Sequence, residues 1–305
     1  MESTKLNNIF FLVYDSRSGS TFLANLLVKY VGAAIPPETN FVYKILSNYN
    51  KNTIDNDRDL NNILEIIYKD RKFSDWNLER KELESCIKPN LPLTIGNLIL
   101  EICSLYKNKN FPNSKIFGLK KSYYLTQYEQ MKKMFPQAKF VGIVRDGRAV
   151  FNSKKHSIYS VTGKPFETNP YKAAKRWCKI CRKLREVQNK YPQETISIRY
   201  EEMIQDTEQT VDRVSQFLNV TELQELENKT YAIPDRYGEL HKNVNKKPLT
   251  NRINAWQKSL SAQEIYAFES IAHKELTLAG YSTINNQFSF NNKLWMGWLK
   301  FLKSS

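Results

Sequence analysis

The turn that follows the first apolar segment consists of small, hydroxyl-bearing residues and one arginine. It has the sequence SRSGST (residues 16–21) and separates the apolar run IFFLVY from a segment with helical periodicity. A strand, a tight turn and a helix in this order can close backbone N–H groups around an anion. The nucleotide-triphosphatase loop GxxxxGK[ST] does not match, because no lysine precedes the Ser/Thr pair, and Arg17 supplies the positive charge instead. The turn predicts either a phosphate-binding loop or an ordinary strand-to-helix connection.

A second candidate for anion binding is the segment RDGRAVFNS. Arg145 stands at the carboxyl end of an apolar run, where ligands of open α/β sheets bind, and Ser153 follows eight residues later. A guanidinium and a hydroxyl placed in this way can hold one phosphate between them. The alternative is that Arg145 pairs with Asp146 and that Ser153 is a solvated helix residue.

The elements that position these residues alternate between strands and helices. Short apolar segments at 9–14, 115–119, 139–146 and 195–200 predict four strands. Helical spacing of apolar residues marks the segments that start at Thr21 and at Pro170, and Ser261 with Glu264 has the form of a capping box for a helix that ends near Gly280. This order predicts an α/β fold with a central, mainly parallel sheet flanked by helices.

The chain shows no linker and no internal repeat, so we expect one domain over residues 1–305. Residues 45–110 are Asn-rich and partly helical. No apolar run approaches the roughly 20 residues that span a bilayer, and the first residues do not form a signal peptide. The sequence therefore predicts a cytoplasmic location.

The charge of +15 predicts an anionic partner, which could be nucleic acid, an anionic membrane surface or a polyanionic small molecule. Cys86, Cys103, Cys178 and Cys181 have no disulfide-framework spacing. The CxxC at Cys178 and Cys181 lies in a helical pattern without further cysteine pairs or paired histidines. Because a zinc site needs four ligands, we expect helix packing and no metal site there.

The two anion-binding candidates together resemble the motifs of one family. SRSGST resembles the 5′-phosphosulfate loop of sulfotransferases that use 3′-phosphoadenosine-5′-phosphosulfate (PAPS), and RDGRAVFNS resembles their 3′-phosphate motif. FPQAKFVGIVRDGRAV and RINAWQKSLSAQE extend the similarity to residues 9–30, 115–220 and 245–281. The resemblance implies a sulfotransferase with a P-loop-like turn after its first strand, with PAPS as sulfuryl donor and a hydroxyl-bearing acceptor.

The resemblance also implies which residues bind the donor. The 5′-phosphosulfate would be held by Arg17, Ser18, Gly19, Ser20 and Thr21, and the 3′-phosphate by Arg145 and Ser153. Tyr200 matches a position near the nucleotide, and Lys246 and Lys247 lie where a late basic loop closes over the 3′-phosphate, unless that loop is simply solvated. The family often has Pro where this chain has Ser16.

The branch of the family is indicated by the residue that matches its catalytic base. The cytosolic branch uses a His soon after a Lys, but FGLKKSYYL has Ser122 at that place, and His156, His241 and His273 match no base. A second branch, which includes tyrosylprotein and many bacterial sulfotransferases, uses a Glu soon after the first helix. PPETNF has Glu38 there, so the resemblance implies Glu38 as the base. The alternative is a carboxylate at a helix N-terminus.

Two cations are implied in the transfer itself. Lys120 matches the Lys that both branches share and would stabilise charge on the oxygen that leaves sulfur, with Lys121 as its competitor for this role. Arg17 would also contact the sulfuryl group. This chemistry requires no metal.

The acceptor and the surroundings of the site are less determined by the sequence. Residues 45–110 match no family motif and are expected to shape the acceptor cleft for a carbohydrate, a lipid head group, a peptide tyrosine or a phenol. The amphipathic tail 286–305 could contact a membrane surface or pack on the core. One alternative is a P-loop-type kinase or nucleotide-binding protein, against which the missing lysine in this chain's loop counts. The other is a basic nucleic-acid-binding protein, for which the sequence has no motif.

Overall fold

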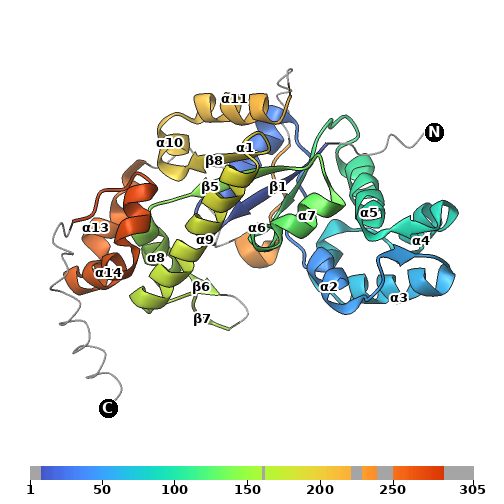
Figure 1. Cartoon of the computed structure of the whole chain (residues 1–305), viewed down its shortest axis with the longest axis horizontal. Coiled ribbons are helices and arrows are strands. Elements are labelled where there is room, and N and C mark those ends of the chain that lie inside the picture. The colour runs from blue at the N-terminus through green and yellow to red at the C-terminus, as the bar shows by residue number, and fades with distance from the viewer. Residues whose placement is uncertain (1–7, 160–161, 221–228, 239–249, 285–305) are drawn as a thin grey trace, which may run out of the picture.

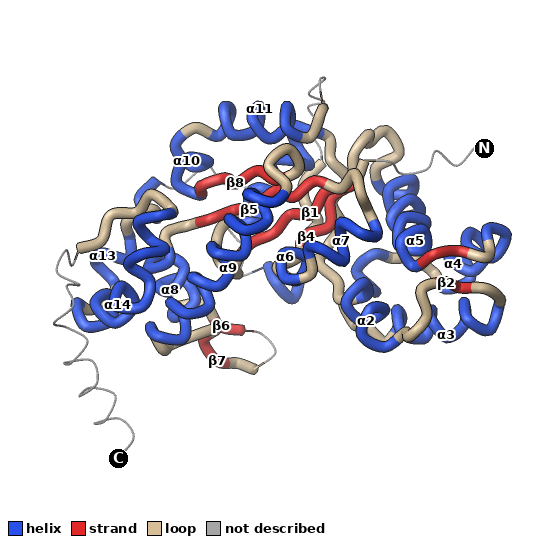
Figure 2. Tube along the Cα trace, in the orientation of Figure 1, coloured by secondary structure: helices blue, strands red, loops and turns tan. Residues whose placement is uncertain are grey.

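The computed structural model describes residues 8–159, 162–220, 229–238 and 250–284 of the 305-residue chain. Lys246, Lys247, His241 and the tail 286–305 lie outside these ranges. A central sheet separates two groups of helices, which lie at opposite ends of the molecule (Figure 1). The strands lie side by side in the middle of the molecule (Figure 2).

The central sheet has four parallel strands in the order β4-β1-β5-β8. These are β1 (Ile9–Tyr14), β4 (Phe117–Lys120), β5 (Lys139–Val144) and β8 (Thr195–Arg199). All six residues of β1 are buried, as expected for a strand with neighbours on both sides and helices on both faces. The predicted α/β fold with a parallel sheet is confirmed.

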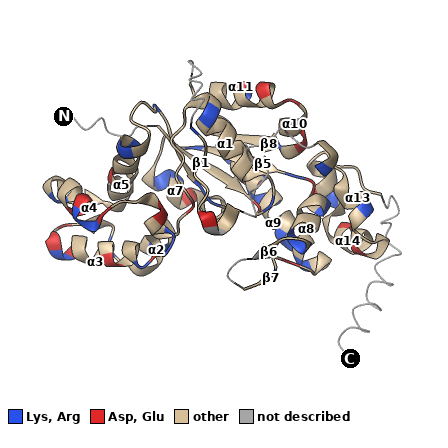
Figure 3. Ribbon diagram, turned by 180° about the vertical axis from the view of Figure 1, so that it is seen from behind, with Lys and Arg blue, Asp and Glu red and all other residues tan. Residues whose placement is uncertain are grey.

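The two faces of the sheet are covered by different helices. α9 (Pro170–Lys190) crosses one face in Figure 1, and α1 (Ser20–Val31) lies over the other, which Figure 3 shows from behind. A side-chain carbon on Gly142 of β5 would lie 2.5 Å from the side chain of Leu184 on α9. The absence of a side chain at this position therefore lets α9 approach the sheet closely.

Helices also fill both ends of the molecule. The end beyond β4 contains α2 (Phe41–Asn48), α3 (Asp57–Tyr68), α4 (Arg80–Ile87) and α5 (Ile95–Asn110), so the predicted helical character of 45–110 is confirmed. The opposite end contains α8 (Gly147–Lys155), α13 (Ala255–Ser259) and α14 (Ala262–Leu278). The remaining elements are β2 (Thr53–Ile54), β3 (Leu93–Thr94), α6 (Tyr123–Thr126), α7 (Tyr128–Met134), β6 (Ile158–Tyr159), β7 (Lys164–Pro165), α10 (Tyr200–Gln205), α11 (Thr207–Phe217), and the 3₁₀ turns Phe73–Trp76, Lys88–Asn90, Asp235–Tyr237 and Thr250–Arg252.

α14 has the ends that its sequence predicts. The Ser261 hydroxyl accepts from the Glu264 N–H, and the Glu264 carboxylate accepts from the Ser261 N–H, so the capping box is present. Gly280 follows the helix with a φ of 79°, a conformation that costs glycine little.

A buried group of charges joins α8 to α14. Arg148, whose side chain is 3% exposed, donates to Asp146 at 3.0 and 2.7 Å and to Glu269 at 2.5 Å. Its guanidinium also lies 4.0 Å from the centre of the Trp256 ring. The partner of Asp146 is therefore Arg148 and not Arg145, which answers one of the alternatives left open by the sequence.

We expect Arg148→Met to reduce the free energy of unfolding by about 3–5 kcal/mol, because it leaves two buried carboxylates without their cation. Urea unfolding followed by circular dichroism measures this change. The matched control is Lys88→Met, since Lys88 and its partner Asp57 are 60% and 58% exposed. The control should leave the unfolding curve almost unchanged. Equal effects of the two substitutions would contradict a structural role for the buried group.

Candidate active site

The turn between β1 and α1 depends on two residues with positive φ. Arg17 has a φ of 71° and Gly19 a φ of 90°. A side-chain carbon on Gly19 would lie 2.4 Å from a ring carbon of Tyr200. The ring can therefore pack against the turn this closely because residue 19 is glycine. Gly19 is also the N-cap of α1, and no side chain caps this helix end. The first N–H groups of α1 can therefore face an anion.

The other residues of the turn are held inside the molecule. Ser18 is 1% exposed, and Ser20 and Thr21 are each 6% exposed. Asp15, which is 2% exposed, accepts from Lys154 of α8 at 2.6 Å and from Arg176 of α9 at 3.1 Å. Because the carboxylate that begins the turn is bonded to two helices, the turn has a fixed place relative to both.

Four of the predicted donor-binding residues meet at this turn. Arg17 Nε donates to Ser153 Oγ at 3.2 Å, and Arg145 Nη1 donates to the carbonyl of Arg17 at 3.1 Å. The Arg145 guanidinium lies over the ring of Tyr200, 4.3 Å from its centre. The structure thus brings together residues from the ends of β1, β5 and β8 and from α8.

Among the residues that the structure describes, no carboxylate pairs with Arg145. Arg145 Nη2 donates to the carbonyl of Arg252 at 3.1 Å, and its Nε is buried without a hydrogen-bond acceptor among the described residues. Burial, followed by the neighbouring Arg145 and Arg252, lowers the pKa of Arg17. A buried donor next to clustered guanidiniums fits an oxyanion such as a phosphate.

Glu38 reaches the sheet through a buried segment that follows α1. Ala34 of this segment forms a bridge to Phe117 of β4, and the carbonyl of Pro37 accepts from the indole N–H of Trp76 at 2.9 Å. α2 begins two residues after Thr39 and has no acidic residue in its first turn. Glu38 is therefore placed by the strand edge, and its position does not match the alternative of a carboxylate at a helix N-terminus.

One oxygen of Glu38 accepts two hydrogen bonds. Oε1 accepts from the hydroxyl of Tyr14 at 2.5 Å and from the ammonium of Lys120. The Lys120 side chain is 3% exposed, whereas that of Glu38 is 29% exposed. Burial alone would raise the pKa of Glu38, but Lys120 and then Tyr14 outweigh it and lower this pKa to about 2. Glu38 is therefore a carboxylate at neutral pH.

Lys121 points to a different partner from that of Lys120. Its ammonium donates to the carbonyl of Thr39 at 3.0 Å and to Asn40 Oδ1 at 2.5 Å. Burial lowers the pKa of Lys121 to about 8. The two neighbouring lysines are thus distinguished by geometry, and Lys120 is the one that contacts Glu38.

Several other candidates lie away from this site. His156 and His273 are exposed, and Ser122 lies in the short turn between β4 and α6. Cys178 and Cys181 are buried on α9, and burial raises the pKa of both thiols. In the described ranges, no group of three or more His, Cys, Asp or Glu side chains is placed to hold a metal ion. No described helix is both long and apolar enough to cross a membrane.

The sequence analysis missed three groups at the site. Tyr14 looks like the last apolar residue of a strand, and nothing in its neighbourhood indicates a contact with Glu38. Asp15 could have been noticed, because an acid directly after a fully apolar strand needs a buried partner. Arg252 had a weaker signal in the phrase RINAWQKSLSAQE, whose first residue contacts Arg145 through its carbonyl.

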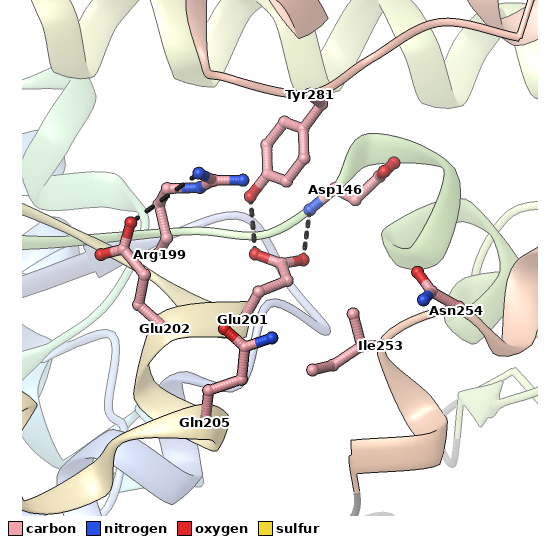
Figure 4. Close-up of a pocket in the computed structure, with 8 residues that line it drawn as sticks. All are labelled: Asp146, Arg199, Glu201, Glu202, Gln205, Ile253, Asn254 and Tyr281. Atoms are coloured by element: carbon pink, nitrogen blue, oxygen red, sulfur yellow. Dashed lines mark hydrogen bonds and ion pairs between the residues drawn. The ribbon is translucent and has the colours of Figure 1, made fainter.

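A pocket of about 260 Å³, lined by Asp146 next to Arg145, is mainly acidic (Figure 4). Glu201 stands at its centre and accepts from the Asp146 N–H at 3.0 Å and from the Tyr281 hydroxyl at 2.8 Å. The other residues that line it are Arg199, Glu202, Gln205, Ile253 and Asn254. Its carboxylates outnumber its single arginine, so this pocket is unsuited to a phosphate.

Comparison with known structures supports the fold. The sulfotransferase domain from the curacin biosynthetic pathway superposes with a TM-score of 0.61 at 19% identity, covering 90% of this chain and 98% of that domain. The sulfotransferase domain of the Synechococcus PCC 7002 olefin synthase gives a TM-score of 0.51 at 18% identity, covering 89% and 95% of the two chains. A search of curated proteins found no match. A model of the sulfotransferase family matches residues 10–225, which is most of the sequence, and the chain therefore belongs to the sulfotransferase family.

Proposed function

We propose that this protein transfers a sulfuryl group from PAPS to a hydroxyl-bearing acceptor. The observation that carries this proposal is that the predicted site residues follow the carboxyl ends of the four parallel strands. Arg17 follows β1, Lys120 ends β4, Arg145 follows β5 and Tyr200 follows β8. Open α/β sheets bind their ligands at this edge.

In this proposal the two phosphate-bearing ends of the donor are bound by different groups. The 5′-phosphosulfate is held by the turn residues Arg17, Ser18, Gly19, Ser20 and Thr21, the last two of which begin α1. The 3′-phosphate is held by Arg145 and Ser153, and the orphaned Nε of Arg145 supports this assignment. The ring of Tyr200 packs against the guanidinium of Arg145. Lys246 and Lys247 remain predictions from the sequence.

The transfer step needs a base, a cation at the leaving oxygen and an in-line approach. The acceptor oxygen forms a bond to sulfur while the bond from sulfur to the 5′-phosphate oxygen breaks, and 3′-phosphoadenosine-5′-phosphate (PAP) leaves with the electron pair. Glu38 takes the acceptor's proton. Lys120 and Arg17 stabilise the negative charge that develops on the leaving and sulfuryl oxygens.

The acceptor class stays broad: a carbohydrate, a lipid head group, a peptide tyrosine or a phenol. Glu38 stands three residues before the start of α2, and the carbonyl of Pro37 beside it accepts from Trp76, so the helical end formed by residues 45–110 borders the carboxylate that would meet the acceptor. This supports the prediction that this end of the molecule shapes the acceptor cleft. A cytoplasmic location also remains a prediction from the sequence.

We expect PAP to bind without magnesium and more tightly than AMP or ATP, as measured by calorimetry. Arg145→Ala combined with Ser153→Ala should weaken PAP binding by about 100-fold, because each charge-assisted hydrogen bond contributes about 1.5–3 kcal/mol. The control is Arg182→Ala, which removes an equal charge from a side chain that is 63% exposed on α9. Its PAP affinity should match that of the unchanged protein.

Binding of ATP as tight as that of PAP would contradict the donor assignment and favour a kinase or another nucleotide-binding protein. PAP binding that survives the double substitution would place the 3′-phosphate elsewhere.

We expect Glu38→Gln to lower the rate of sulfuryl transfer by about 10²–10⁴-fold, because the amide cannot accept the proton. PAP affinity should stay unchanged. Transfer from radiolabelled PAPS to tyramine, N-acetylglucosamine and p-nitrophenol measures the rate, once one of them is shown to be an acceptor. Since the pKa of Glu38 lies at about 2, kcat/KM of the unchanged enzyme should show no acid limb from this group above roughly pH 5. A fully active Glu38→Gln enzyme would rule out this base.

A further inference from the structure

Tyr14 is a buried tyrosine at the carboxyl end of β1, and the reaction described above gives it no task. Its side chain is 6% exposed, and its hydroxyl donates to Glu38 Oε1 at 2.5 Å. Its ring also lies 4.9 Å from the ammonium of Lys120. Tyr14 thus contacts both the proposed base and the proposed cation of the transfer step.

The two donors on Glu38 converge on the same oxygen. Tyr14 and Lys120 both bond to Oε1, and no hydrogen bond to Oε2 is present among the residues that the structure describes. The Glu38 side chain is 29% exposed, so part of it reaches the surface, while Oε1 is bonded to its two buried donors. Oε2 is therefore the atom that an incoming hydroxyl can meet.

Lys120 has two tasks that compete for one ammonium group. In this structure it pairs with Glu38, but the proposed transfer requires it near the oxygen that leaves sulfur. Moving the ammonium to that oxygen removes one donor from Oε1 and leaves a largely buried carboxylate short of a partner. Tyr14 belongs to a rigid, fully buried strand and does not have to move with Lys120.

We propose that Tyr14 is a positioning residue that keeps Glu38 Oε1 hydrogen-bonded when Lys120 turns to the donor, so that Oε2 receives the acceptor's proton. This inference rests on the proposed function. The step is balanced: the oxygen–sulfur bond to the acceptor forms, the bond to the 5′-phosphate oxygen breaks, and PAP departs with its electron pair. The proton moves to Oε2, and the Tyr14 hydroxyl keeps its own proton throughout.

The electrostatic surroundings support a tyrosine that acts only as a donor. Burial, and then the charge of Glu38, raise the pKa of Tyr14 well above its ordinary value, so the phenol stays protonated near neutral pH. The titratable groups that are electrostatically coupled to Glu38 are Lys120 and Lys121 at the end of β4, Tyr14 on β1, Tyr124 on α6 and Tyr231 of the segment 229–234. Tyr14 is the one of these tyrosines whose side chain is bonded to the carboxylate.

The test is the proton affinity of Glu38 in the complex with saturating PAP, followed by carbon-13 NMR of glutamate-labelled protein. The Glu38 signal is assigned by its loss in Glu38→Gln. We expect Tyr14→Phe to raise the proton affinity of Glu38 by about tenfold or more, because a hydrogen bond to the charged form lowers a carboxyl pKa. The matched control is Tyr124→Phe, a buried tyrosine that packs on Phe11 and has no hydrogen bond to Glu38 in this structure.

The same samples separate the failure of this inference from the failure of the proposed function. If PAP does not bind the unchanged protein, the proposed function fails. If PAP binds and Tyr14→Phe leaves the proton affinity of Glu38 unchanged, or Tyr124→Phe changes it equally, the positioning role is wrong.

A second measurement covers the case in which Tyr14→Phe does not fold. In the unchanged protein with PAP bound, the Tyr14 hydroxyl proton should give a downfield proton resonance that exchanges slowly with water. This resonance should be absent from Glu38→Ala. A spectrum without it would show that the hydrogen bond does not persist in the donor complex and would overturn the inference.

Discussion

Parallel strands that are covered on both faces can carry polar side chains only where they end, and this constraint determines where the chain can do chemistry. Every residue of β1 is buried, and the first charged residue after it is Asp15. In β5 the four middle residues are buried, and Arg145 is the first charged residue after the strand. Because neighbouring strands end at the same edge, residues that are far apart in the sequence meet there without any further device.

Buried charges in this molecule fall into two groups, those paired with an opposite charge and those that are not. Asp15 with Lys154, and Arg148 with Asp146 and Glu269, form ion pairs whose members are nearly all buried and satisfied. They join the turn and the C-terminal helices to the rest of the fold. Within the described part of the chain, Arg145 has only carbonyl acceptors and keeps a buried N–H group without one. This difference separates charges that hold the structure from one suited to a ligand.

Much of the fold could be predicted from the sequence, because buried parallel strands are short, apolar and easily recognised. The site could be predicted only in part from the sequence. The motifs indicated the turn residues, Arg145 and Ser153, and the resemblance indicated Glu38. The contact between Tyr14 and Glu38, however, depends on the path of residues 33–37 along β4, which no local pattern encodes. Likewise, Arg148 bonds to Asp146 within the first turn of α8, but its second carboxylate, Glu269, lies on α14 and depends on the tertiary fold.

The close approach of Gly19 to the Tyr200 ring has a consequence for how this sequence can change over time. A side-chain carbon at position 19 would lie 2.4 Å from the ring of Tyr200, so the ring or the turn would have to shift to admit it. Each position therefore limits what evolution can place at the other, although β5 and more than half of the chain separate them in sequence. A lineage that places a larger residue at position 19 has to move or shrink this ring, and the Arg145 guanidinium that lies over the ring is then disturbed as well.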